Sequence, residues 1–359
     1  MCPRTLCYLG TYTHTTSRGI YLYEQDPTSG ALHPVSVSPA GEHPSYLAFH
    51  PSGRYLYAVN ETMEWEGRPS GGVSAYTIDA ANGALALINR QASRGASPCY
   101  VSVDATGQVL LVANYHGASV AALPIAADGA LAPASDYHPY DPTPAEAARQ
   151  KVGHGHCIIV DPTNRYAIAC DAGLDRLMLY RLDPAQGKLL PNDPPCLQLR
   201  EGAAPRHIVI HPNRRWAYAI GESSSTMFAL IWDEARGTLA EMQAIATLPA
   251  GFSGRNACAD VHVHPTGRWL YGSNRGHDSI VAYAIDQATG QLALLGHTPT
   301  QGQTPRNLAL DPSGTYLYAE NQRSDTVVCF RVDGATGALA PTGFVLRAPI
   351  PVCLRFRVV

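Results

Sequence analysis

GAAPRHIVIHPNRRWAYAIGE, at residues 202–222, decides the fold because it contains a complete β-hairpin that recurs along the chain. A short β-branched run is followed by the turn residues His211-Pro212-Asn213 and by a second run of aromatic and aliphatic residues. Arg206 begins the first strand and Glu222 follows the second, and antiparallel pairing brings these two positions to the same end of the sheet. A tight hairpin does not require charged residues there, so the pair needs another explanation.

The hairpin occurs six times, and all copies align without gaps. After each copy the chain carries a third and a fourth strand, such as GGVSAYTID followed by GALALINRQ. The turn position, Pro212 in the hairpin above, recurs every 47–57 residues, a period typical of β-propeller blades. Each repeat is therefore predicted to be a four-stranded blade. The other five copies are residues 44–61, 98–115, 155–172, 258–275 and 305–322.

The two ends of the chain supply a seventh blade. Residues 5–34 contain a second, a third and a fourth strand, but no first one. The missing strand lies at the other end, where PVCLRFRV (351–358) aligns in register with 205–212. A last blade built from both termini leaves no exposed sheet edge. We therefore predict an all-β protein, a seven-bladed β-propeller with four-stranded blades, as a single domain over residues 1–359.

The composition indicates a protein with a large core, because 45% of its 359 residues are hydrophobic. The net charge of -3 argues against a nucleic-acid partner. No apolar run is long enough to span a membrane, and the N-terminal MCPRTLCYLGTYTH lacks a signal-peptide pattern. Nine cysteines, most within strand patterns, indicate reduced thiols in a cytoplasmic protein. We expect a monomer or weak homo-oligomer that uses no cofactor.

Two positions of the repeat hold polar side chains that the fold does not require. The entry position, six residues before the turn position, holds Ser45, Cys99, His156, Arg206, Ala259 and Arg306. The exit position, ten residues after it, holds Glu61, Tyr115, Ala172, Glu222, Arg275 and Gln322, and it is preceded by Asn60, Asn114, Asp171, Gly221, Asn274 and Asn321. The first strand of a propeller blade lines the central channel, so we expect these residues around one mouth of that channel.

Four of these residues, His156, Arg206, Glu222 and Arg275, are charged or titratable and come from neighbouring blades. We predict that they form the active site, and the alternative is a structural ion-pair network. We expect the asparagines to close turns through side-chain to backbone hydrogen bonds. Packing or turn roles are expected for His207, His211, His262 and His264, and solvent exposure for Arg54, Arg165, Arg214, Arg215 and Arg268.

An insertion at residues 136–156 is the longest departure from the repeat. Its Thr143-Pro144-Ala145-Glu146 predicts a capped helical turn of about six residues. The basic residues Arg149 and Lys151 would bring charge toward the channel mouth, unless the insertion is merely a tolerated surface loop. His154 and His156 point to the same side of a strand, but no further ligand accompanies them, so we expect no metal site.

Several segments resemble a known family. RQKVGHGHCIIVDP (149–162), GAAPRHIVIHP ending in Glu222, and above all ADVHVHPTGRWLYGSNRGHDSI (259–280) are similar to the seven-bladed propeller lactonases. That family includes bacterial 6-phosphogluconolactonases and fungal carboxymuconate lactonising enzymes. The resemblance implies a site of one histidine, two arginines and one glutamate, which falls on His156, Arg206, Arg275 and Glu222. The chain departs from the family pattern at Gly221, where asparagine is more frequent, and at Asp260, where glutamate is common.

The resemblance implies cofactor-free hydrolysis of 6-phospho-D-glucono-1,5-lactone to 6-phosphogluconate. An imidazole is a natural general base near neutral pH, so His156 is the first candidate and Glu222 the alternative. Arg206 and Arg275 would bind the phosphate or meet the oxyanion, and the sequence does not assign these two roles. A muconate-type lactonising enzyme and a non-enzymatic interaction scaffold are the alternative functions. Further substrate-binding candidates are His154, Arg149, Asn114, Asp260 and Arg306.

Overall fold

A computed structural model describes residues 4–359 of the protein, and most of their regular structure is β-strand. These residues form seven four-stranded sheets and one two-stranded sheet, β6 (Glu64–Trp65) with β7 (Arg68–Pro69). The same part of the chain contains one short helix, α1 (Pro144–Ala148). Seven four-stranded sheets are the blades of a seven-bladed β-propeller, so the predicted fold class is confirmed.

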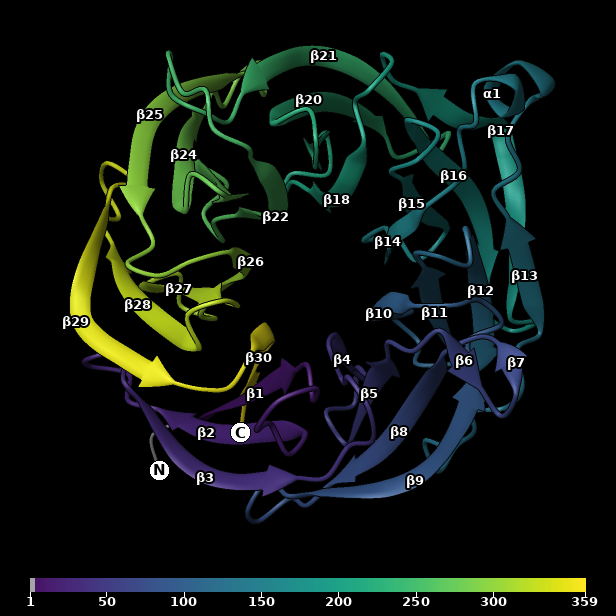
Figure 1. The fold of residues 1–359 in the computed structure, drawn as a ribbon, viewed down its shortest axis with the longest axis horizontal. Helices are drawn as coiled ribbons and strands as arrows, with labels where there is room; N and C mark the ends of the chain where they lie inside the picture. Colours follow the sequence, from purple (N-terminus) through teal and green to yellow (C-terminus); the bar gives the residue numbers. More distant parts are fainter. Residues whose placement is uncertain (1–3) are drawn as a thin grey trace. The chain divides into compact units, whose positions relative to one another are not determined.

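The described chain divides into two compact units, and unit 2 consists of Ser38–Ile208 with Asp233–Leu239. It contains three sheets, of which the middle one touches the other two through β10, the neighbour of both β4 and β14. Figure 1 shows these sheets side by side. Their strands, in order of pairing, are β4 (Leu47–Phe49), β5 (Tyr55–Asn60), β8 (Gly72–Ile78) and β9 (Leu85–Ala92); β10 (Pro98–Val103), β11 (Val109–Asn114), β12 (Ser119–Pro124) and β13 (Asp136–Pro139); and β14 (Gly155–Val160), β15 (Tyr166–Asp171), β16 (Arg176–Asp183) and β17 (Lys188–Gln198).

Unit 1 consists of the described residues up to Val37 with Val209–Trp232 and Ala240–Val359. Within it, β26 is the neighbour of both β22 and β30. Its strands are β22 (Ala257–Val263), β23 (Trp269–Arg275), β24 (Ser279–Ile285) and β25 (Leu292–Pro299); β26 (Pro305–Leu310), β27 (Tyr316–Asn321), β28 (Thr326–Val332) and β29 (Leu339–Arg347); and β30 (Pro351–Val358), β1 (Thr5–Thr11), β2 (Ile20–Gln25) and β3 (Leu32–Ser38). The seventh sheet, with segments of both units, is β18 (Pro205–Ile210), β19 (Trp216–Gly221), β20 (Thr226–Asp233) and β21 (Thr238–Ala246).

The two ends of the chain share one blade, as predicted. Strand β30 pairs antiparallel with β1, with Leu354 opposite Leu9 and Val358 opposite Thr5. Leu354 and Leu9 are both buried and belong to one hydrophobic cluster with side chains of β27 and β28. The C-terminal strand therefore completes the blade that both termini share, and it also packs against the neighbouring blade.

Neighbouring blades are tied together by buried tyrosines of the second strands. In each of four tyrosines the phenol hydroxyl donates to the carbonyl of a glycine in the last turn of the adjacent blade. Burial raises the pKa of these phenols, so they remain neutral donors. The pairs are Tyr57 with Gly129 (3.1 Å), Tyr218 with Gly290 (2.9 Å), Tyr271 with Gly337 (2.8 Å) and Tyr318 with Gly30 (2.6 Å).

The expected roles of the turn residues are confirmed. The ring Nε2 atoms of His211 and His264 bond to the carbonyls of Gly267 and Gly314 in the next hairpin turns. The asparagine amides donate to backbone carbonyls, as Asn274 does to Thr247 at 2.8 Å. The hairpin arginines Arg54, Arg165, Arg214, Arg215 and Arg268 are exposed.

Candidate active site

A β-bulge lies at the entry position of several blades. Between β14 and β15, Gly155 is opposite Asp171 and Cys157 is opposite Cys170, which leaves His156 as the extra residue. The same shift leaves Cys99 extra in the second copy of the hairpin and Arg306 extra in the last. An extra residue leaves the regular alternation of the strand and its side chain is re-aimed. The bulge therefore explains why the side chain at this position of the repeat does not follow the packing pattern of the strand and can serve in binding or catalysis.

His156 and Arg206, both in unit 2, are joined by His207. The ring centroids of His156 and His207 are 5.3 Å apart, and Nη1 of Arg206 lies 3.2 Å from Nε2 of His207. A guanidinium only donates, so His207 accepts at Nε2 and is neutral in this contact. All three residues are buried. Two of the predicted site residues are thus brought into one cluster.

Aromatic rings enclose this cluster. His207 packs edge-on against Tyr46 and Tyr100, with ring centroids 5.9 Å and 5.2 Å away. Tyr115 packs edge-on against His156 at 5.4 Å. The sequence predicted only a packing or turn role for His207, and its alignment in the repeat with Tyr46 and Tyr100 was the available signal for a ring in this place.

Glu222 and Arg275, both in unit 1, form an ion pair. Glu222 directly follows β19, Arg275 ends β23, and Nη2 of the arginine donates to Oε1 of the glutamate. The side chains are 23% and 11% exposed. Arg275 also donates through Nε to the carbonyl of Ala257 at 3.1 Å and through Nη2 to that of Cys258 at 2.9 Å. This mostly buried guanidinium is therefore held in one orientation.

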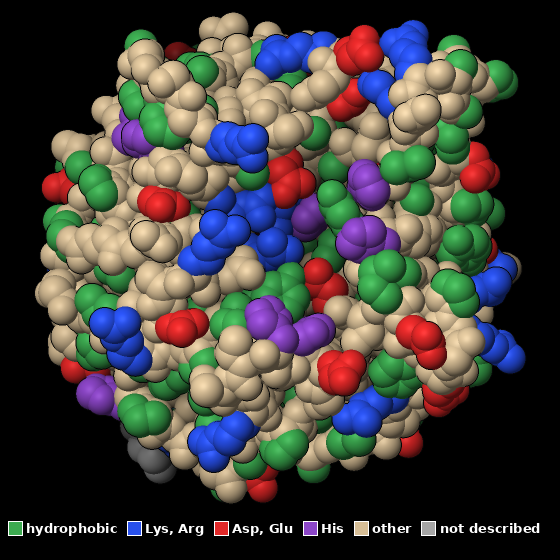
Figure 2. Space-filling model, in the orientation of Figure 1, with side chains coloured by type: hydrophobic (Ala, Val, Ile, Leu, Met, Phe, Trp, Pro, Cys, Tyr) green, Lys and Arg blue, Asp and Glu red, His purple; other side chains and the backbone are tan. Residues whose placement is uncertain are grey.

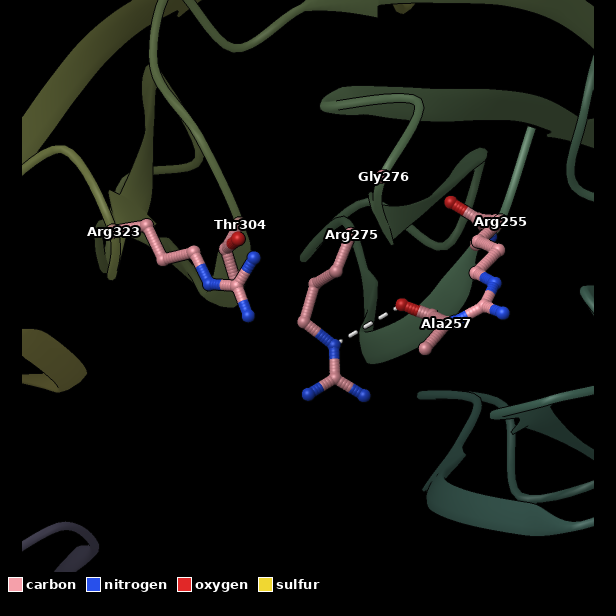
Figure 3. Close-up of a pocket in the computed structure, with 7 residues that line it drawn as sticks. Arg255, Ala257, Arg275, Gly276, Thr304 and Arg323 are labelled. Atoms are coloured by element: carbon pink, nitrogen blue, oxygen red, sulfur yellow. Dashed lines mark hydrogen bonds between the residues drawn. The ribbon is translucent and has the colours of Figure 1, made fainter.

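Arg275 also lines a cavity of about 320 Å³, which Figure 3 shows with Arg275 between two further arginines. Figure 2 shows Lys and Arg side chains gathered where Figure 1 labels β22 and β26. The sequence prediction did not include the two additional arginines, because neither occupies the entry or exit position. The cavity is lined by Arg255, Asn256, Ala257, Arg275, Gly276, Thr304 and Arg323.

The remaining substrate-binding candidates have structural contacts of their own. His154 stacks on Tyr115, with ring centroids 4.4 Å apart, so it lies one ring away from His156. Asn114 is buried, and its amide donates to the carbonyl of Ser93 and to the hydroxyl of Ser119. Arg306 lies over the ring of Tyr12 at 5.5 Å.

The insertion before β14 forms the predicted helical turn. Thr143 caps α1, and a capping box links it to Glu146. Arg149 is 61% exposed and pairs with Glu201 at 3.2 Å, while Lys151 pairs with Asp175 at 3.1 Å. The charge of Arg149 is therefore directed to an exposed ion pair.

Asp260 is the centre of a buried network between β22 and β26. Its Oδ2 accepts from Nε2 of His262 at 2.9 Å, from the backbone N–H of Leu308 at 3.1 Å, and from the amide of Asn307. Asp260 is buried, and these contacts satisfy its charge while tying two blades together. His262 is thus a partner of Asp260 as well as a packing residue.

Glu320 lies beside this network and has no such partners. It is fully buried on β27, and within residues 4–359 no group donates a hydrogen bond to either carboxyl oxygen. Burial and the nearby negative charge of Asp260 raise its pKa well above the ordinary value. The other copies have Val59, Ala113, Cys170, Ile220 and Ser273 at this position. Glu320 is therefore a neutral acid at a position where the other copies have no carboxylate.

We expect Glu320→Gln to remove one source of pH dependence from the stability of the protein. Above the pKa of the unfolded chain, about 4.3, the unfolded state has lost the Glu320 proton while the folded state retains it. Wild-type stability therefore falls as the pH rises toward the raised pKa, by at most about 1.4 kcal/mol per pH unit. Urea unfolding of both proteins from pH 5 to pH 8 should show the stability of Glu320→Gln increasing relative to wild type. Parallel pH profiles would contradict a neutral Glu320.

The described residues were expected to hold no metal site and to carry reduced thiols. Among residues 4–359 no three His, Cys, Asp or Glu side chains are grouped to hold a metal ion. The eight cysteines of this part are all free, and Cys2 lies outside the described residues. Cys99 is in contact with His156, and its thiol lies 3.4 Å from the His156 carbonyl. No described helix has the length and apolarity to cross a membrane.

Comparison with known proteins places the chain among lactonases. The sequence profile described as "Lactonase, 7-bladed beta-propeller" matches residues 6–356. The 6-phosphogluconolactonase of Bacillus subtilis (strain 168) is 35% identical over 305 residues, which cover 85% of this chain and 84% of that protein. The 6-phosphogluconolactonase of Formosa agariphila is 32% identical over 85% of this chain and 86% of its own. The solved periplasmic gluconolactonase of Pseudomonas aeruginosa superposes with a TM-score of 0.91, at 32% identity over 99% of both chains.

Proposed function

The chain belongs to the seven-bladed β-propeller lactonase family, and from this premise we propose that it hydrolyses 6-phospho-D-glucono-1,5-lactone to 6-phosphogluconate. The observation that carries the proposal is Arg275, a guanidinium fixed on one side by Glu222 and facing a cavity lined by two more arginines. Such a site favours an anionic substrate over a neutral one. The names of the relatives from Bacillus subtilis and Formosa agariphila support the same substrate.

We propose that His156, Arg206, Glu222 and Arg275 act together on the lactone. In the sequence repeat, Arg206 begins the first strand of a predicted hairpin and Glu222 follows the second. Antiparallel neighbours bring such positions to the same sheet end. His207 links Arg206 to His156, and the ion pair links Glu222 to Arg275. These contacts support one pair of members within each unit, and joining the two pairs in one site is our proposal from the repeat and the family resemblance.

Hydrolysis forms a bond between the oxygen of water and the carbonyl carbon of the lactone. It breaks the bond between that carbon and the ring oxygen, which receives a proton. His156 is proposed as the base that activates the water, because an imidazole accepts a proton near neutral pH. Glu222 is proposed to orient Arg275, with which it already pairs.

Arg206 is proposed to stabilise the oxyanion. It is only 2% exposed, and an arginine shielded from water acts more strongly on a developing negative charge. Its contact with His207 helps to fix the orientation of the guanidinium. The anionic tail of the substrate is then left to Arg275 and its cavity. This division, which the sequence left open, is part of the proposal.

We propose one lactonase domain over residues 1–359, acting in the cytoplasm as a monomer or weak homo-oligomer. The family match over residues 6–356 supports the single domain. The eight free thiols support a reducing compartment. Because the Pseudomonas aeruginosa relative is named periplasmic, cell fractionation is the test of location.

The proposed reaction is tested by comparing substrates with the chelator-treated protein. Opening the lactone releases a proton, so an indicator dye follows the reaction after subtraction of spontaneous hydrolysis. We expect kcat/KM for fresh 6-phosphogluconolactone to exceed that for glucono-1,5-lactone by roughly ten- to a hundredfold, the effect of one charge-assisted contact. Carboxymuconate, monitored by its ultraviolet absorbance, should not react. Turnover of carboxymuconate alone would replace the proposal with the lactonising reaction.

A further inference from the structure

The backbone beside the Arg275 cavity is held by an aspartate, in a hydrogen-bonding pattern that recurs in the fold. Oδ1 of Asp278 accepts the backbone N–H groups of Gly276 at 3.2 Å and of Thr304 at 2.8 Å. In the same way, Asp175 accepts a hydrogen bond from the backbone N–H of Ala204, and Asp325 accepts one from that of Ile350. Holding consecutive blades together is therefore the role of this aspartate, and the carboxylate is occupied by backbone donors.

Arginine side chains distinguish this junction from the others. The position that directly follows the exit position holds Arg323 here, whereas the other copies have Thr62, His116, Gly173, Ser223 and Gly276. Arg255 comes from the linker before β22, outside the repeat. Figure 3 shows both arginines flanking Arg275. Neither arginine is required by the repeat.

The linker that carries Arg255 is held against the turn after β23. The amide of Asn256 donates to the hydroxyl of Ser225 at 2.9 Å, and its carbonyl accepts the backbone N–H of His277 at 3.2 Å. A Cβ atom on Gly276 would lie only 2.1 Å from the backbone oxygen of Arg255, so glycine permits this close approach. The position of Arg255 is thus set by the backbone.

The side chains of Arg255 and Arg323 have no hydrogen-bond partner among the described residues. Within residues 4–359 no carboxylate or carbonyl accepts a hydrogen bond from either side chain, and both are exposed. Arg275, by contrast, pairs with Glu222. Hairpin arginines elsewhere have partners, as Arg268 does in the carbonyl of Ala335. The cavity therefore presents, beside the fixed guanidinium, two more whose donors are not used by described protein groups.

We propose that Arg255 and Arg323 form a phosphate subsite next to Arg275, which binds the phosphate group of the sugar lactone. The proposal rests on the proposed function and deepens it by naming the residues that select the phosphorylated substrate. Two guanidinium groups match the two charges of a phosphate monoester and donate to its oxygens in pairs. The hydroxyl of Thr304 lines the same cavity and supplies a further donor. The cavity volume is at the lower end for small-molecule sites.

The subsite is tested with Arg255→Met and Arg323→Met, which keep most of the side-chain length and remove the charge. We expect each variant to raise the KM for 6-phosphogluconolactone about tenfold or more, with kcat nearly unchanged. The kinetics of glucono-1,5-lactone, which has no phosphate, should stay within about twofold of wild type. Arg268→Met is the matched control, because Arg268 is exposed in the hairpin turn between β22 and β23 and does not line the cavity. Equal losses with both lactones, or no loss with either, would overturn the subsite.

Binding measurements separate a failure of the subsite from a failure of the proposed function. Calorimetric titration with 6-phosphogluconate and with gluconate requires no turnover. Preferential binding of 6-phosphogluconate that is weakened about tenfold in Arg255→Met and Arg323→Met supports the subsite, even if the protein hydrolyses neither lactone. Unchanged 6-phosphogluconate affinity in both variants would overturn it, even if the wild type proves to be an active lactonase.

Discussion

Alanine at His156, Arg206, Glu222 or Arg275 is expected to lower the kcat for 6-phosphogluconolactone by at least about tenfold to a hundredfold. Losses of this size follow the removal of a general base or of an oxyanion donor. The reaction is followed by proton release, and circular dichroism verifies that each variant is folded. Because Arg206 is buried against His207, Arg206→Lys is included, and it should retain the fold and the charge while losing the planar geometry.

The matched controls for these variants are Arg54→Ala and Arg268→Ala. Both residues are exposed and lie over the ring of the following aromatic residue, Arg54 at 5.4 Å from Tyr55 and Arg268 at 4.9 Å from Trp269. Their removal deletes the same charge without touching the proposed site, so activity should stay within about twofold. Equal damage from the control arginines would mean that the entry and exit positions have no special role.

The Glu222 and Arg275 pair allows a sharper form of the same test. If Glu222 acts through Arg275, the double variant Glu222→Gln with Arg275→Met should lose little more activity than Arg275→Met alone. The contact between these side chains is the physical basis of that expectation. Fully additive losses would instead assign Glu222 an independent step, such as activating the water.

Deletion of residues 351–359 is expected to yield aggregated protein or a Tm lower by roughly 20 °C. The deletion removes β30, and with it the buried Val352, Cys353 and Leu354. Each lost buried side chain costs on the order of 2–5 kcal/mol, and a kilocalorie corresponds to about 1–2 °C in a protein of this size. Strand β1 would also have an unpaired edge. Calorimetry or light scattering during heating measures the effect.

The control for this deletion removes only Val358 and Val359. Both are exposed, although the backbone of Val359 exchanges two hydrogen bonds with Arg4, at 3.0 Å and 2.9 Å. We expect a Tm loss of a few degrees, because a hydrogen bond at a chain end contributes about 1 kcal/mol. A full deletion that melts like this control would mean that the terminal strand does not hold the blade together.

The fold could be read from the sequence because the repeat is local. Turn residues and strand-forming runs recur in each copy, and the strand that completes the last blade aligns with 205–212 without a gap. The helical turn α1 was predicted for the same reason, since Thr143 and Glu146 form a capping box within four residues. Signals that act over a few residues are visible in a single sequence.

The candidate site was only partly predictable, because its remaining features depend on contacts between blades. A gapless alignment conceals the bulge at His156, since the extra residue occupies the same place in three of the copies. The contact between Arg206 and His207 was not foreseen, although the two are adjacent in sequence. Arg255 was missed because its linker has no counterpart in the repeat, and Glu320 because its burial follows from blade packing.

The central claim is that His156, Arg206, Glu222 and Arg275 form one site for a sugar lactone, and a crystal structure with bound 6-phosphogluconate tests it most directly. The account predicts the carboxylate of this product within hydrogen-bond distance, about 2.6–3.2 Å, of Arg206 or His156, with the remainder of the molecule extending toward Arg275. Binding of 6-phosphogluconate at a place that involves none of these four residues would contradict it.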